Sequence, residues 1–242
     1  MRAAVLALSL ALAPAAAQAK MPPGPYGPVP DMGGEKFATL LVDRLEVRNE
    51  GDQGALLWDT SGWYGGDTSK LRLKAEGTLD LEGPVEEAEF QALYSRAVST
   101  FFDVNLGVRQ DIKPNPDRTH LVIGLEGLAP YWFEVDAAAF LSNEGELTAR
   151  IEAEYELLFT QRLILQPRVE VNFAAQDVPE LGIGKGLSDF ELGLRLRYEL
   201  VREYAPYIGI EWVHDVGNAS FTRAAGGDAT AIIGLVGLRA WF

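Results

Sequence analysis

Apolar and polar residues alternate with a period of two along most of this chain, the spacing that places successive side chains on opposite faces of a β-strand. In the stretch 189–200, apolar residues occupy the even positions from Phe190 to Leu200, and charged residues and one glycine occupy most of the odd ones. The same alternation recurs in 162–173, 150–159 and 70–79. No ten-residue stretch after residue 36 has convincing helical periodicity, so this part of the chain is predicted to be all-β.

The polar face of these strands carries charges of both signs. A soluble sandwich would turn its apolar face inward, whereas a membrane barrel turns that face to lipid and lines its lumen with the charges. So many charges on one face favour a shared polar lumen, with these residues lining it: Glu46, Glu76, Glu89, Glu134, Asp136, Glu152, Glu154, Arg168, Glu191, Arg195, Arg197, Glu199 and Arg239. The carboxylates could act as weak stations for divalent cations, but ion-pair networks that hold the interior are the favoured interpretation.

The pattern predicts an antiparallel transmembrane outer-membrane β-barrel of about twelve strands. Short turns between even and odd strands alternate with longer loops such as 113–117, 176–187 and 215–228, as outer-membrane barrels require. An open lumen and one filled by side chains both fit twelve strands. The predicted strands lie near 38–48, 54–64, 68–79, 86–97, 101–111, 119–128, 131–141, 146–158, 161–173, 188–200, 204–214 and 229–242.

Local features refine this strand assignment. Asp43 falls on the apolar face of the first strand, which indicates a bulge or a position at the headgroup boundary. The last strand alternates up to Phe242 and resembles the signal read by the bacterial barrel-assembly machinery. The aromatic pairs Tyr131–Trp132 and Trp241–Phe242 are expected in an interfacial girdle.

The first 36 residues are predicted to lie outside the barrel. Residues 1–19 combine Arg2, an apolar run and a small-residue cleavage motif, so they are expected to be a signal peptide. The apolar run is shorter than the roughly 20 residues that a transmembrane helix needs. Residues 20–36 hold five prolines and form a predicted flexible arm, and 37–242 form the barrel. The expected location is the bacterial outer membrane, in contact with its lipid.

Composition narrows the choice of partners. The chain has 21 Lys and Arg residues against 35 Asp and Glu, a formal net charge of −14, and no cysteine. This acidic balance argues against nucleic acid as a partner. The missing cysteines exclude disulfides and thiolate metal sites.

Several motifs occur in order along the chain, at residues 43–46, 58–59, 62–67, 74–77, 91–96, 128–134, 165–168, 186–189 and 205–209. Together they resemble the copper-resistance protein B family over 37–242. The resemblance implies an outer-membrane copper-tolerance protein that works beside a periplasmic multicopper oxidase and sequesters or moves copper. Family members often have a Met- and His-rich region before the barrel, whereas residues 20–36 supply only Met21 and Met32.

His120 and His214 are the only histidines, and Met21, Met32, His120 and His214 are the candidate copper ligands. Both histidines are predicted near the external rim, but on different faces of their strands. Two unrelated rim residues are therefore favoured over a joint copper site. Neither histidine lies in a recognisable catalytic motif, so no enzymatic activity is expected.

The predicted function is an outer-membrane barrel that binds, sequesters or passes copper ions. The alternative is a structural or porin-like barrel for small solutes without metal preference.

Overall fold

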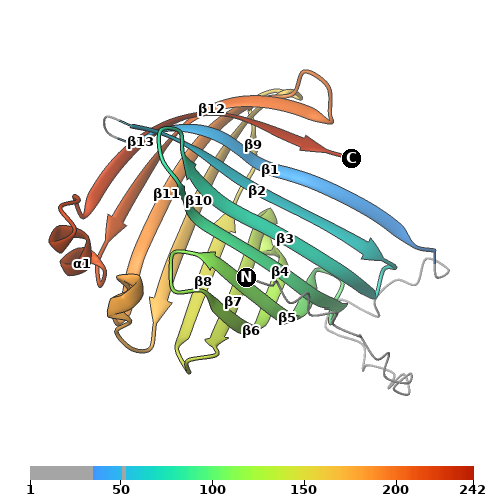
Figure 1. Ribbon diagram of the computed structural model, residues 1–242. Coiled ribbons are helices and arrows are strands. Elements are labelled where there is room, and N and C mark those ends of the chain that lie inside the picture. The colour runs from blue at the N-terminus through green and yellow to red at the C-terminus, as the bar shows by residue number, and fades with distance from the viewer. Residues whose placement is uncertain (1–34, 51–52) are drawn as a thin grey trace, which may run out of the picture.

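The computed structural model describes residues 35–50 and 53–242, and in this part the chain forms one closed antiparallel β-barrel (Figure 1). The predicted signal peptide and nearly all of the predicted arm lie outside the described residues. The strands are β1 (Phe37–Glu50), β2 (Gln53–Gly65), β3 (Ser69–Asp80), β4 (Val85–Ala97), β5 (Phe102–Lys113), β6 (Arg118–Ala129), β7 (Phe133–Ser142), β8 (Leu147–Glu154), β9 (Leu157–Leu158), β10 (Leu163–Ala174), β11 (Gly186–Tyr198), β12 (Tyr204–Asp215) and β13 (Thr230–Trp241).

The barrel closes where β13 pairs antiparallel with β1, from Leu41 opposite Trp241 to Asn49 opposite Gly234. The short β9 is a continuation of β8, because both segments pair with β10. The backbone N–H of Tyr155, between them, also donates to the carbonyl of Pro167 in β10 at 3.1 Å. The wall therefore has twelve strands, and the predicted fold class and strand number are confirmed.

The two faces of the wall differ as the alternation predicts. Large apolar side chains point outward and stay exposed, as at Leu121 (63% exposed) and Ile232 (70% exposed). Charged side chains point inward and are buried, and Glu46 and Glu211 are completely inaccessible. An apolar outer belt around a polar interior is the arrangement that lipid requires of a membrane barrel. No helix in the described residues has the length and apolar character needed to cross a membrane.

Asp43 occupies a β-bulge. The registers of β1 with β2 and with β13 both shift next to Val42. The extra residue turns the Asp43 side chain toward the interior, where its carboxylate meets Arg239 Nε at 2.8 Å. Of the two predicted explanations for this residue, the bulge is therefore confirmed.

The connections at the two ends of the barrel differ in length. One end, the turn end, carries the short connections after β2, β4, β6, β9 and β11. The opposite end, the loop end, carries the long connections 175–185 and 216–229, which contain the 3₁₀ turn η2 (Pro179–Leu181) and the helix α1 (Ala219–Ala224) (Figure 1).

Two connections differ from the prediction. The segment between β5 and β6 is only four residues, because both strands extend further than the alternation indicates. At the turn end, β7 begins at Phe133 rather than residue 131, because Tyr131 and Trp132 have left-handed backbone angles (φ 67° and 68°) that cannot continue a strand. These two residues belong to the 3₁₀ turn η1 (Pro130–Trp132) and are highly exposed.

The outward-facing apolar belt predicts that a charge placed in it lowers stability. Ile210→Lys places a charge in the middle of β12, where the isoleucine is half exposed between Leu194 and Gly234. We expect it to lower the free energy of unfolding by about 2–4 kcal/mol in lipid vesicles, whereas Ile112→Lys near the loop end should cost about 0–1 kcal/mol. Guanidinium titration of both variants measures the difference. Equal costs would contradict a lipid-facing belt.

Candidate functional site

Four buried acidic and basic side chains form a closed ring of ion pairs in the interior. Glu46 and Arg48 lie two apart on β1 and so face the same side, Arg195 comes from β11 and Glu211 from β12. Successive nitrogen–oxygen distances are 3.0 Å for Arg48–Glu46, 2.6 Å for Glu46–Arg195, 2.8 Å for Arg195–Glu211 and 2.5 Å for Glu211–Arg48. Each side chain is at most 7% exposed. Burial strengthens these attractions and makes an unpaired member costly.

Tyr207 reaches the ring of ion pairs by crossing over a glycine of the strand between them. Gly237 of β13 lies opposite Tyr207 of β12 on one side and opposite Glu46 of β1 on the other. A Cβ on Gly237 would lie 2.5 Å from the Tyr207 ring, so only glycine leaves room for the ring to cross β13. The Tyr207 hydroxyl then donates to Glu46 at 3.0 Å.

Arg168 of β10 is the second centre of the interior. Its side chain is 1% exposed, and its nitrogens lie 2.8 Å from Glu152, 3.5 Å from Glu154 and 3.3 Å from Glu191. It also pairs closely with Glu170. One guanidinium therefore contacts four carboxylates, and one of these, Glu170, is also paired with Arg150.

Arg150 of β8 reaches across the lumen. Its guanidinium lies 3.0 Å from Glu76 of β3 and 3.4 Å from Glu89 of β4, and 3.3 Å from Glu170 on the adjacent strand β10. Glu76 in turn accepts from Arg44 at 2.8 Å, and Glu89 from Arg109 at 2.7 Å. These contacts connect opposite walls of the barrel.

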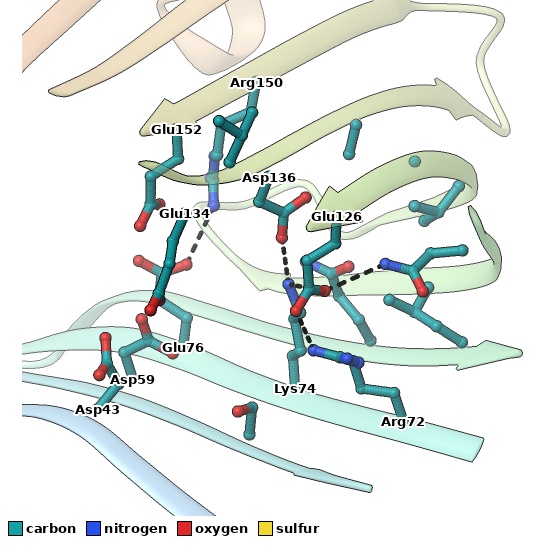
Figure 2. A pocket seen from close by; sticks show the side chains of 18 of the residues that line it. Asp43, Asp59, Arg72, Lys74, Glu76, Glu126, Glu134, Asp136, Arg150 and Glu152 are labelled. Atoms are coloured by element: carbon teal, nitrogen blue, oxygen red, sulfur yellow. Dashed lines mark hydrogen bonds and ion pairs between the residues drawn. The ribbon is translucent and has the colours of Figure 1, made fainter. Parts of the chain in front are cut away.

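The described residues line one cavity toward each end of the barrel. The turn-end cavity has a volume of about 370 Å³ and reaches Leu128, Glu134 and Arg239. The loop-end cavity has a volume of about 410 Å³ and reaches Pro114 and Asn218. Among the described residues, nine carboxylates but only four cationic side chains line the turn-end cavity: Asp43, Asp59, Glu76, Glu89, Glu126, Glu134, Asp136, Glu152 and Glu154 against Arg72, Lys74, Arg150 and Arg239. Figure 2 shows several of these carboxylates directed into the cavity, among them Glu76, Glu126 and Asp136.

The charges of the turn-end cavity are unevenly paired. Lys74 lies 2.5 Å from Asp136, and Arg72 pairs with Glu126 (Figure 2). Within the described residues Glu134 has no ion-pair partner. The cavity thus presents a net negative surface that attracts cations.

The two histidines lie on opposite faces of the wall. His120 is buried in the interior, with its Nδ1 3.6 Å from Asp111 and its ring edge against Phe140. His214 points outward, where it packs against Phe190 and Trp212 and its Nδ1 lies 2.7 Å from the Thr230 hydroxyl. The structure does not bring them together.

No group of three or more His, Cys, Asp or Glu side chains in the described part of the chain has metal-holding geometry. Met21 and Met32 lie outside that part, so their assignment as copper ligands stays a prediction.

The thirteen residues predicted to line the lumen all contact the interior network or a cavity. Glu134 lines the turn-end cavity, and the other twelve have ion pairs. Glu211 and Arg48 were not among the predicted site residues, although Glu211 alternates with the outward Ile210 and Trp212 and could have been found by that signal.

At the loop end, outside the membrane-spanning strands, Glu146 forms hydrogen bonds with residues at the ends of β6 and β7. It accepts from Arg118 Nε at 2.9 Å and from the Ser142 hydroxyl at 2.7 Å, and Arg118 also reaches Glu180 at 2.9 Å. The hydrogen bond from Arg118 keeps the pKa of Glu146 below its ordinary value, against the opposing effect of burial.

A closed antiparallel barrel with an apolar belt and a charged interior defines the class of outer-membrane β-barrels. Similar solved structures are the NanC porin (TM-score 0.54, 13% identity, 83% of this chain and 98% of that one) and the KdgM porin (TM-score 0.50, 12% identity, 85% and 99%). At these identities the likeness concerns the fold.

Sequence comparison defines the family. Residues 36–242 match the sequence profile of the family described as "Copper resistance protein B precursor (CopB)". The chain is 45% identical to "Copper resistance protein B homolog" of Pseudomonas syringae pv. tomato and 44% identical to "Copper resistance protein B" of Escherichia coli, each over 84% of this chain and 69% of the relative. The chain belongs to the copper resistance protein B family.

The buried ring of ion pairs predicts that removing one of its charges lowers stability. Glu46→Gln removes the charge between Arg48 and Arg195 and should lower the free energy of unfolding by about 3–5 kcal/mol, because both guanidinium groups stay buried. The matched change Glu180→Gln, at a 68% exposed rim position, should cost less than about 1 kcal/mol. Urea titration in lipid vesicles compares them. A loss below 1 kcal/mol for Glu46→Gln would contradict a structural role of the ring.

The contact between Arg118 and Glu146 predicts how the stability of the barrel depends on pH. Since the pKa of Glu146 is lower in the folded state, its ionised form stabilises the fold above the unfolded value of about 4.3, and this contribution is lost as the pH falls further. The difference in unfolding free energy between the wild type and Glu146→Gln should therefore be largest near neutral pH and shrink below about pH 4. A difference that stays constant under acid would show that the charge contributes nothing.

Proposed function

We propose that this protein raises copper tolerance by taking copper ions into the acidic turn-end cavity at the outer membrane, where it binds them weakly and passes or retains them. The single observation that carries this proposal is the excess of nine carboxylates over four cationic side chains around that cavity. Membership of the copper resistance protein B family supports copper as the ion.

Electrostatics supports weak binding at several positions. A carboxylate and a divalent ion roughly 8 Å apart attract each other by about 1 kcal/mol at a water-like dielectric, so several carboxylates together concentrate ions. Oxygen ligands hold copper less tightly than thiolate or imidazole ligands do. A cavity lined by carboxylates therefore suits ions that enter and leave.

Residues 20–36 would supply a second type of ligand. The thioethers of Met21 and Met32 suit soft Cu(I), whereas the carboxylates of the cavity suit Cu(II). The expected partner is a periplasmic multicopper oxidase. Copper titration of the mature protein with and without residues 20–36 separates the contributions of arm and barrel.

Glu134 provides the sharpest test of the cavity. Glu134→Gln removes a lining carboxylate that has no ion-pair partner among the described residues, so the fold should tolerate the change. We expect Cu(II) affinity, measured by calorimetry, to fall by about 1 kcal/mol, or about fivefold. Glu203→Gln, an exposed turn residue at the same end, should leave affinity unchanged.

The cellular experiment tests the role itself. Deleting the gene should lower copper tolerance and change cellular copper, and the wild-type gene should restore both. Unchanged tolerance and unchanged cellular copper would refute the proposed role. Channel conductance insensitive to copper, together with that result, would favour the porin-like alternative.

A further inference from the structure

The turn-end and loop-end cavities meet at one layer of side chains. Glu76, Glu89, Phe140 and Arg150 are the four residues that line both cavities. These residues come from β3, β4, β7 and β8, so the layer reaches from one wall of the barrel to the other. We call this layer the partition.

Arg150 is the residue that closes the partition. From β8 it reaches Glu76 at 3.0 Å and Glu89 at 3.4 Å on the opposite wall, and Figure 2 shows its guanidinium directed into the lumen toward Glu76. Phe140 fills space beside it and packs under the guanidinium of Arg109, 4.7 Å from the ring centre. The partition therefore depends on cross-lumen ion pairs made by one side chain.

The rest of the lumen beside the partition is filled by more deeply buried side chains. Arg44 bridges Glu76 and Asp59, and Arg168 and the ring around Glu46 occupy the side formed by β10 to β1. The side chains of Arg44 and Arg168 are 5% and 1% exposed, whereas those of Arg150 and Glu76 are each 25% exposed. The loosest point of the layer is thus the pair that joins the two cavities.

We propose that Arg150 is the residue that determines whether small inorganic ions pass between the two cavities. Its side chain lies between the two cavities, and its positive charge is fixed at the partition of an otherwise acidic lumen, where it repels cations. The ion pair with Glu170 on the neighbouring strand holds Arg150 to its own wall when the contacts with Glu76 and Glu89 open. This inference goes beyond the proposed function and holds whichever cation is the cargo.

Single-channel conductance in potassium chloride tests the proposal. Arg150→Ala should raise conductance several-fold and shift the reversal potential in a salt gradient toward greater cation selectivity, because both the obstruction and its charge are removed. Arg197→Ala is the matched control, since it removes the same charge from the barrel interior at a residue that lines neither cavity and does not contact the partition. It should keep the conductance of the wild type.

Two results would overturn the proposal: wild-type conductance in folded Arg150→Ala, or an equal rise in Arg197→Ala. Heat-modifiable migration on a gel shows whether each variant is folded. If Arg150→Ala does not fold, Glu89→Gln serves instead, because it keeps the side-chain volume and removes one cross-lumen ion pair. Conductance in Glu89→Gln must then exceed that of the wild type, and no increase would refute the role of Arg150. The recordings contain no copper, so their outcome is separate from the test of copper tolerance.

Discussion

The structure depends on one constraint: charges removed from water inside the barrel must find partners of opposite sign. Lipid outside obliges each strand to place its apolar residues outward, so most charged residues of the alternating pattern turn inward. There, an unpaired buried charge would cost several kcal/mol. The ring of Glu46, Arg48, Arg195 and Glu211 and the contacts of Arg168 satisfy this requirement between strands distant in sequence.

The same constraint shapes the lumen. Ion pairs between opposite walls fill the middle of the barrel and leave one cavity toward each end. Carboxylates outnumber cationic side chains around both cavities, so pairing is incomplete, and the excess is larger around the turn-end cavity. Structural ion pairs and a cation-attracting cavity are therefore consequences of one charge distribution, and the two explanations of the lumen carboxylates do not exclude each other.

The sequence predicts the wall of this barrel well and its interior only in part. Period-two alternation identifies all twelve strands and their faces, and the misplaced Asp43 marks the bulge. Alternation cannot say which charges meet across the lumen: Arg150 and Glu76 are 74 residues apart, and their contact depends on closure of the whole barrel. The role of Gly237 is equally hidden, because it arises from the neighbouring Tyr207 and Glu46 in the closed sheet. The family assignment came from collinear motifs, which carry no information about the partition.

The central claim is that the uncompensated negative charge of the interior draws copper into the turn-end cavity. Anomalous diffraction at the copper edge, from crystals of the full chain grown with Cu(II), tests this most directly. The account predicts anomalous density in the turn-end cavity near Glu134, on the turn side of Arg150. Density confined to His214 on the outer face, with none inside the barrel, would contradict it.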